Sequence, residues 1–207
     1  PFIDNNEINA VKKVINSGWL TSGKETKKFE TNIKKYINCK NVLAVNSCTS
    51  GLNSAMHALN LKKGDEVITS PMTFVSAINN LYNFGLKIKL VDIDLETYMM
   101  DVDKLKKSVS SKTKCIIITH YGGVPFDIDK IVSFCRKKKI KIIEDAATAL
   151  GSKINGKYIG SNSHSVAVFS LYANKIITTG EGGIMTCEDD KLANRIKIIN
   201  SCGISKD

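Results

Sequence analysis

The stretch CIIITHYGGVPFDIDKIVSFCRKKKIKIIED, residues 115–145, decides the fold of this chain. It opens with an apolar run at 115–119 and continues with a segment at 128–138 whose apolar residues recur at helical spacing. A second apolar run follows at 140–144. A buried strand, a helix and another buried strand in this order predict a parallel strand–helix–strand unit, because parallel neighbours are joined by a crossover.

The same alternation continues in both directions along the chain. We expect further strands at 42–45, 67–69, 88–93, 166–171 and 183–187, and further helices at 49–60, 73–84, 102–109 and 190–201. A first helix begins at a capping box of Asp4 and Glu7 and stops at Gly18. The dipeptide Asn155-Gly156 marks a tight hairpin turn. Apolar strands predict an α/β fold, a three-layer α/β/α arrangement whose mixed sheet is mainly parallel with at least one antiparallel member.

Composition excludes several classes of protein. The chain has 207 residues, 43% hydrophobic and 24% charged, which indicates a globular domain with one core and excludes disordered, collagen-like and coiled-coil chains. Apolar runs of about five or six residues are far short of the roughly 20 that cross a bilayer, so no membrane partner is expected. The six cysteines lack the spacing of a zinc site, so no metal is expected. With no secretory signal visible, we expect a reduced, cytoplasmic protein.

The net charge of +10 points at first to nucleic acid. However, Arg136 and Arg195 are the only arginines among 30 basic residues, and the lysines are scattered over expected helix faces. Proteins that recognise bases and phosphates rely on the planar guanidinium group of arginine, which forms paired hydrogen bonds. Scattered lysines are instead typical of a solvated surface. We therefore expect no nucleic-acid partner.

Residues that could bind a ligand or take part in catalysis follow the expected strands. The segment NSCTSG at 46–51, which includes Thr49 and Ser50, leads from a strand into a helix. Free N–H groups and hydroxyls at a positive helix terminus suit a phosphate, although the same residues also suit a plain helix cap. Phe74 lies at the next strand-to-helix junction, where an aromatic ring either stacks on a planar ligand or belongs to the core.

Two charged positions complete this set. Asp145 and the preceding Glu144 follow an apolar strand, where a buried acid needs a partner. A cationic ring nitrogen is one such partner, and the cap of a following turn is the alternative. Lys175 lies between apolar residues and a glycine-rich turn, and a desolvated lysine can act as a nucleophilic amine. Because ligands of such sheets bind at the carboxyl ends of the strands, we expect these groups around one ligand.

In this order, these motifs resemble the DegT/DnrJ/EryC1/StrS family of sugar aminotransferases, which use pyridoxal phosphate on the fold-type-I transferase scaffold. The segments that carry the resemblance are 18–23, 46–52, 73–74, 91–94, 120–125, 144–147 and 169–183. Each motif is weak alone, but the ordered set is specific. The resemblance implies that Lys175 binds the cofactor covalently and shuttles protons, that Asp145 pairs with the pyridine nitrogen, and that Phe74 stacks on the ring.

The resemblance also implies a phosphate site and shows two departures. Thr49, Ser50 and Ser170 would hold the phosphate. Thr148 stands where family members usually carry Gln or His, whose side chain contacts the phenolic oxygen of the cofactor. The side chain of Thr148 is shorter than either, which weakens the expectation of that contact here. Cys202 stands where a family segment has His, and either departure could alter the choice of substrate.

The resemblance implies transfer of an amino group from an amino acid, usually glutamate, to a nucleotide-linked keto sugar, commonly a 4-keto-6-deoxy sugar. Family members run on through a smaller C-terminal domain and work as homodimers. We therefore expect residues 1–207 to be the large, cofactor-binding domain of a longer protein. Two alternatives remain open, a pyridoxal-phosphate enzyme of another reaction type, such as a dehydratase, and a non-catalytic regulator with the same fold.

Overall fold

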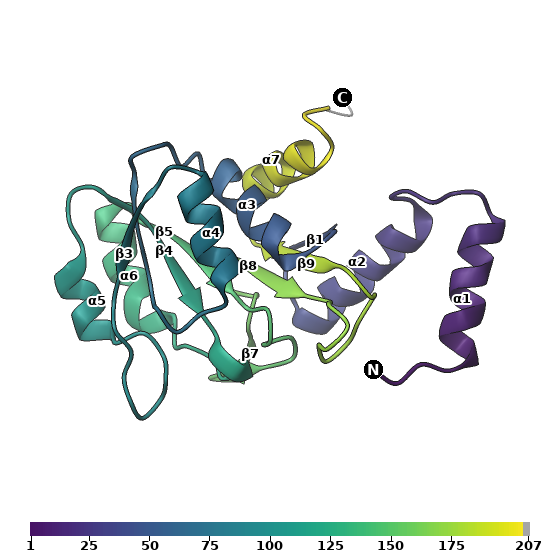
Figure 1. Ribbon diagram of the computed structural model, residues 1–207, viewed down its shortest axis with the longest axis horizontal. Helices are drawn as coiled ribbons and strands as arrows, with labels where there is room; N and C mark the ends of the chain where they lie inside the picture. Colours follow the sequence, from purple (N-terminus) through teal and green to yellow (C-terminus); the bar gives the residue numbers. More distant parts are fainter. Residues whose placement is uncertain (205–207) are drawn as a thin grey trace.

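The computed structural model describes residues 1–204 and contains one large mixed sheet between helices (Figure 1). The helices are α1 (Asn5–Asn16), α2 (Lys24–Ile37), α3 (Cys48–Ala58), α4 (Val75–Asn83), α5 (Val102–Ser108), the short η1 (Tyr121–Gly123), α6 (Asp129–Lys138) and α7 (Asp190–Asn200). The main sheet contains β1 (Asn41–Val45), β2 (Glu66–Thr69), β3 (Lys87–Leu90), β4 (Thr113–Thr119), β5 (Lys141–Asp145), β8 (Ser165–Ser170) and β9 (Gly183–Cys187). Its strand order is β1-β9-β8-β5-β4-β2-β3.

The sheet is mainly parallel, as the sequence predicts. Strands β8, β5, β4, β2 and β3 pair in parallel, whereas β9 runs antiparallel to both of its neighbours, β1 and β8. The hairpin at Asn155-Gly156 also forms, with both residues at positive φ as a tight two-residue turn requires. It joins β6 (Lys153–Ile154) to β7 (Lys157–Tyr158) in a separate two-stranded ribbon, so β9 alone is the antiparallel member of the main sheet.

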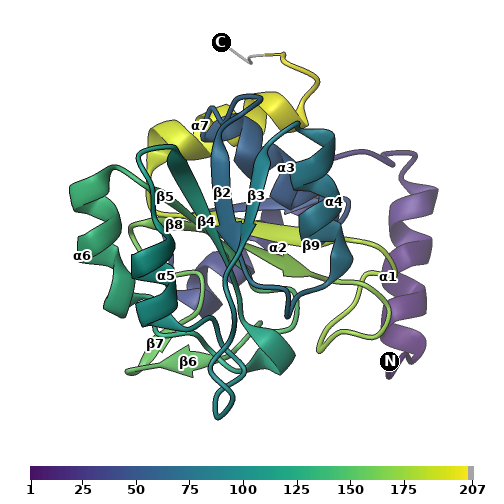
Figure 2. The same cartoon turned by 60° about the vertical axis from the view of Figure 1, so that its left-hand side comes forward.

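Helices cover both faces of the sheet, which gives the expected three layers (Figure 2). Successive strand residues point to opposite faces. Thus Ile117 packs in the core under α3, α4 and α7, while Ile116 and Ile118 pack in the core under α5 and α6. Helix α2 covers the β8–β9 part of that second face, where it packs over Phe169. Both faces of the strands are therefore buried, which explains why their sequences are apolar throughout.

Two segments differ from the predicted elements. Helix α2 is not among the helices expected from the sequence, yet it buries Ile33 and Ile37 against the sheet. Strand β3 ends at Leu90, three residues earlier than expected, because the chain turns away into a loop in which Oδ1 of Asp94 accepts hydrogen bonds from the backbone N–H groups of Glu96 and Thr97.

Helix α1 stands apart from the sheet (Figures 1 and 2). Its capping box is present, with the Asp4 N–H donating to Oε2 of Glu7 at 2.8 Å. However, α1 has no buried residue, and its apolar face of Ile8, Val11 and Ile15 is 57–59% exposed. Within residues 1–204, none of the helices has the length and apolar character needed to span a membrane.

Candidate active site

A cavity of about 460 Å³ lies at the carboxyl-terminal ends of the parallel strands. Segments that follow β1, β2, β4, β5 and β8 line it. Because β9 is antiparallel, its starting end meets the same edge and brings Glu181 and Gly182 to the wall. Six of the seven residues predicted for the site line this one cavity, namely Thr49, Phe74, Asp145, Thr148, Ser170 and Lys175.

Ser50 is the predicted residue that does not line the cavity. Its hydroxyl is engaged in the cap of α3, where it contacts the side chain of Asn46 and lies 2.8 Å from the carbonyl oxygen of Ser47. Its backbone N–H donates to Oγ of Ser47, the residue that caps the helix. For Ser50 the structure therefore supports the helix-cap interpretation of this motif.

The first turn of α3 still offers donors to the cavity. The N–H groups of Cys48 and Thr49 begin the helix, where backbone donors have no intrahelical partner and attract anions. Gly183 brings β9 against this turn, since a Cβ at that position would lie 2.8 Å from the backbone nitrogen of Cys48. The absence of a side chain at Gly183 thus lets the start of β9 pack directly against this turn.

Asp145 is a buried carboxylate aimed at the cavity. It is 3% exposed, and burial raises the pKa of its carboxyl group above the usual range. The Ala147 N–H donates to Oδ1 at 3.2 Å, and Sγ of Cys48 lies 3.9 Å from the same oxygen. Burial raises the pKa of the Cys48 thiol, so this group is a protonated donor. Among residues 1–204, no hydrogen bond reaches Oδ2, and a cation in the cavity would compensate the buried charge.

Lys175 supplies the opposite charge on the same cavity. It ends a turn in which its N–H donates to the carbonyl oxygen of Tyr172 at 2.9 Å. Within the described chain, its Nζ atom forms neither a hydrogen bond nor an ion pair. Phe74 is 71% exposed at the start of α4, so its ring is not part of the core and faces open space beside the cavity. An amine, a carboxylate and an aromatic face thus surround one space.

The two departures from the family pattern lie in different places. The Thr148 hydroxyl donates to the carbonyl oxygen of His120 at 3.2 Å, so its proton is already used and its oxygen remains an acceptor. Cys202 is exposed in the turn after α7 and does not line the cavity. Of the two, only Thr148 is placed to touch a ligand in this cavity.

Several cavity residues were missed by the sequence analysis as individual candidates. They are Ser47, Cys48, Ser76, Tyr121, Asn174 and Glu181. The available signal was position, because each follows the end of a parallel strand or precedes β9. Polar residues are common in such loops, so position alone does not separate those that face the cavity from those that face solvent.

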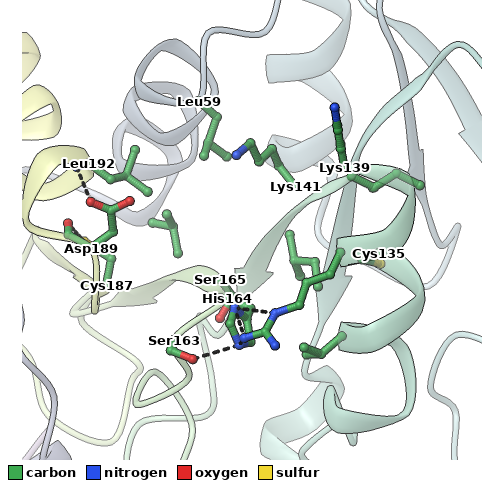
Figure 3. Close-up of a pocket in the computed structure, with 15 residues that line it drawn as sticks. Leu59, Cys135, Lys139, Lys141, Ser163, His164, Ser165, Cys187, Asp189 and Leu192 are labelled. Carbon is green, nitrogen blue, oxygen red and sulfur yellow. Dashed lines mark hydrogen bonds between the residues drawn. The ribbon is translucent and has the colours of Figure 1, made fainter.

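A second cavity of about 440 Å³ lies at the other ends of the parallel strands, where β5 and β8 begin (Figure 3). Its wall carries Lys139, Lys141 and His164 and contains none of the predicted site residues. Within residues 1–204, no group of three or more His, Cys, Asp or Glu side chains is arranged to hold a metal ion. The cavity at the carboxyl-terminal edge is therefore the candidate active site.

The model of the DegT/DnrJ/EryC1/StrS aminotransferase family matches residues 1–207. The chain belongs to this family. It is 43% identical over 207 residues to the uncharacterized protein MJ1066 of Methanocaldococcus jannaschii. It is 38% identical over 206 residues to the spore coat polysaccharide biosynthesis protein SpsC of Bacillus subtilis. Each match covers all of this chain but only 53% of the relative. The chain therefore spans about half the length of these curated relatives.

Solved structures of two aminotransferases and a dehydratase share the fold. The aminotransferase from Psychrobacter cryohalolentis matches with a TM-score of 0.94 at 31% identity, over 100% of this chain and 53% of that one. PseC of Helicobacter pylori, an aminotransferase of pseudoaminic acid biosynthesis, matches with a TM-score of 0.92 at 31% identity, over 100% and 56%. The E. coli GDP-4-keto-6-deoxy-D-mannose-3-dehydratase with bound hydrated PLP matches with a TM-score of 0.87 at 29% identity, over 96% and 52%. The fold is therefore that of the fold-type-I pyridoxal-phosphate enzymes.

Proposed function

We propose that this family member is the large domain of a pyridoxal-phosphate-dependent aminotransferase that moves an amino group from an amino acid to a nucleotide-linked keto sugar. The observation that carries the proposal is the opposed pair Asp145 and Lys175 on one cavity. A buried acid with one oxygen open to the cavity, and an amine with no partner in the described chain, match the two ends of a cationic pyridine aldehyde. Membership of an aminotransferase family supports the same assignment.

The side chains present fit pyridoxal phosphate. Asp145 would hold the ring nitrogen, Phe74 would cover one ring face, and Lys175 would bind the aldehyde carbon through Nζ. The N–H groups at the start of α3, together with Thr49 and Ser170, would hold the phosphate. When bound, this cofactor supplies an electron sink for the pair of electrons left when a proton departs from the substrate carbon.

Two residues of this chain would carry out the proton chemistry. Once the amine of the substrate has displaced it from the cofactor, the free Nζ of Lys175 would accept a proton from the substrate carbon and return it to the former aldehyde carbon of the cofactor, as a general base and then a general acid. Asp145 would remain ionised beside the cationic ring, because the attraction between opposite charges is strong where water is excluded. The hydroxyl oxygen of Thr148, whose proton is held by the His120 carbonyl, would accept rather than donate a hydrogen bond at the cavity.

Glutamate as amino donor and a 4-keto-6-deoxy sugar as acceptor are the substrates that we propose. Names of relatives support a sugar substrate, since SpsC acts in polysaccharide biosynthesis and PseC in pseudoaminic acid biosynthesis. We further propose that these residues belong to a longer protein in which a smaller domain follows them, because the relatives are about twice as long. We also propose that this longer protein is homodimeric and cytoplasmic. A partner subunit would then complete the phosphate site.

A dehydratase is the second candidate function. The structural match to the E. coli dehydratase extends over 96% of this chain, so the fold accommodates both reactions. Transamination needs a base that moves a proton from the substrate carbon to the former aldehyde carbon of the cofactor, and Lys175 provides such an amine.

Absorbance spectroscopy of the full-length protein tests the proposal. With added pyridoxal phosphate we expect a visible band that Lys175→Ala abolishes and that Lys62→Ala, at an exposed lysine outside the cavity, leaves unchanged. Glutamate should then convert the band to that of the amine form. Absence of any Lys175-dependent band would refute the proposal, and a band that glutamate cannot convert would favour the dehydratase.

A further inference from the structure

A second acidic side chain, Glu144, lies buried directly behind the candidate site. It precedes Asp145 on β5 and, by strand alternation, points to the opposite face of the sheet. Glu144 is 1% exposed, and its Oε2 lies 2.9 Å from Nε2 of His120, which is also 1% exposed. Its other carboxylate oxygen accepts a hydrogen bond from the Ser165 hydroxyl. The network therefore joins the ends of β4 and β5 to the start of β8, and the proposed reaction uses none of its side chains.

The backbone decides which nitrogen of His120 carries the proton. The Phe126 N–H lies 2.9 Å from Nδ1 of His120, and an amide N–H can only donate. Nδ1 is therefore the acceptor, and Nε2 carries the hydrogen that it donates to Glu144. The ring thus bridges a backbone donor and a carboxylate in one fixed tautomer.

The same histidine forms part of the cavity wall. Its backbone N–H donates to the carbonyl oxygen of Asp145 at 3.0 Å, and its own carbonyl oxygen accepts the Thr148 hydroxyl. The turn that follows, η1, places Tyr121 on the cavity. The backbone of His120 thus connects the hydrogen-bonded ring to Asp145, to Thr148 and to the turn that carries Tyr121.

Stability alone does not account for such a network. Buried pairs of polar and ionisable groups are often replaced by apolar residues with no loss of stability, because desolvation offsets their attraction. In some proteins such networks instead fix a unique arrangement of the neighbouring groups. Here the neighbouring groups belong to the cavity wall.

We infer that His120 and Glu144 are positioning residues: through the Ser165–Glu144–His120 hydrogen bonds they fix the direction in which Asp145 and the η1 turn face the cavity. The inference rests on the proposed function, since it assigns the network a role in binding the cofactor. His120 and Glu144 themselves would not touch the cofactor, because Glu144 points to the far face of the sheet and both ring nitrogens of His120 are engaged elsewhere.

Three substitutions separate positioning from charge and from packing. Glu144→Gln keeps an oxygen for His120 and offers an amide donor to Ser165, but removes the charge. Glu144→Leu removes the hydrogen bonds of this side chain to His120 and Ser165 and puts an apolar side chain of similar size in its place. His120→Asn keeps an acceptor for the Phe126 N–H and loses the contact with Glu144, so it tests the pair without disturbing the turn directly.

The measurements are pyridoxal-phosphate affinity, circular dichroism of the bound cofactor band, and ¹⁵N NMR of the histidine rings in the ligand-free full-length protein. We expect Nε2 of His120 to be the protonated nitrogen in the wild type. In Glu144→Leu and His120→Asn we expect about tenfold weaker cofactor binding, in line with losses of outer positioning partners, and a changed dichroism band. In Glu144→Gln, affinity should stay within about twofold of the wild type because the hydrogen bonds remain.

Each result decides between the hypotheses. Unchanged affinity and dichroism in His120→Asn overturn the positioning role, and they do so even where Glu144→Leu does not fold. Equal losses in Glu144→Gln and Glu144→Leu also overturn it, because charge rather than hydrogen-bond geometry would then matter. If the wild type shows no Lys175-dependent band, the proposed function fails. The ligand-free protein then tests the inference, which predicts that the amide resonances of Asp145 and Tyr121 shift in Glu144→Leu and return in Glu144→Gln.

Discussion

At the scale of single residues, Asp145 illustrates the tension between stability and function. The same burial that raises the pKa of its carboxyl group makes ionisation costly in the ligand-free protein. A carboxylate whose ionisation is costly in the ligand-free protein but favourable beside a bound cation is typical of a binding site. Such sites often depart from the patterns that stabilise the rest of a fold. Glu144, one residue earlier, is equally buried but satisfied on both oxygens by His120 and Ser165.

Replacing Asp145 should therefore change how stability depends on pH. An aspartate in the unfolded chain titrates near pH 3.9, whereas the folded form holds its proton more tightly. Its favourable contribution is thus present below about pH 4 and is lost as pH rises toward the folded pKa. We expect ligand-free Asp145→Asn to unfold at a higher temperature than wild type at pH 7, with the difference shrinking toward pH 4, as measured by calorimetry at several pH values.

Asp190→Asn is the control with the opposite sign. Asp190 is exposed, and hydrogen bonding from Lys40 at 2.5 Å lowers the pKa of its carboxyl group. This substitution should leave the unfolding temperature at pH 7 unchanged or slightly lower, because surface pairs contribute little. A destabilised Asp145→Asn protein at pH 7 would contradict the view that the buried charge of Asp145 is costly in the ligand-free protein.

At the scale of elements, β9 shows how strand direction builds the site. Because β9 runs antiparallel to β8, its starting residues reach the edge where the parallel strands end. Gly183 at that start lies against the first turn of α3, with no room for a Cβ beside the backbone of Ser47, Cys48 and Phe169. The supporting contact is between backbone atoms, which cannot move aside as a flexible side chain can.

Gly183→Ala should therefore damage both the fold and the proposed phosphate site. We expect a loss of about 1–3 kcal/mol in the free energy of unfolding, the usual range for overpacking, together with weaker binding of pyridoxal phosphate. Urea denaturation and an absorbance titration measure the two effects. Ile184→Val, at the next position of β9, should cost about 1 kcal/mol and leave the affinity unchanged. Equal affinities for the alanine variant and the wild type would show that β9 does not support the turn.

At the scale of the whole molecule, the core is accounted for by the packing of the sheet, whereas α1 buries none of its residues within residues 1–204. The two faces of the sheet account for the apolar content of the strands and helices. The excess of 30 basic over 20 acidic residues is carried mostly by lysine, as expected for a solvated surface. The apolar face of α1 is left over, which is consistent with the proposal that these residues belong to a longer protein.

The exposed face of α1 leads to a prediction for the 207-residue chain. Replacing Ile8 and Val11 together by serine should change the free energy of unfolding by no more than about 0.5 kcal/mol, since both side chains are already in water. Ile37→Ala, in the packed helix α2, should cost about 2–5 kcal/mol in the same denaturation experiment. A large loss in the serine variant would show that α1 packs against the rest of this chain.

The sequence by itself determined the type and order of most elements, because apolar runs, helical spacing and the Asp4–Glu7 and Asn155-Gly156 motifs are local signals. It also singled out Asp145 and Lys175, since charged residues beside buried strands stand out in any chain of this kind. Only the tertiary structure decided which neighbours face the cavity. In that structure Ser50 takes part in the capping box of α3, the ring of Phe74 is exposed, and Glu144 is hydrogen-bonded to His120 and Ser165. These outcomes depend on strand order and on contacts between residues far apart in sequence, which no local pattern encodes.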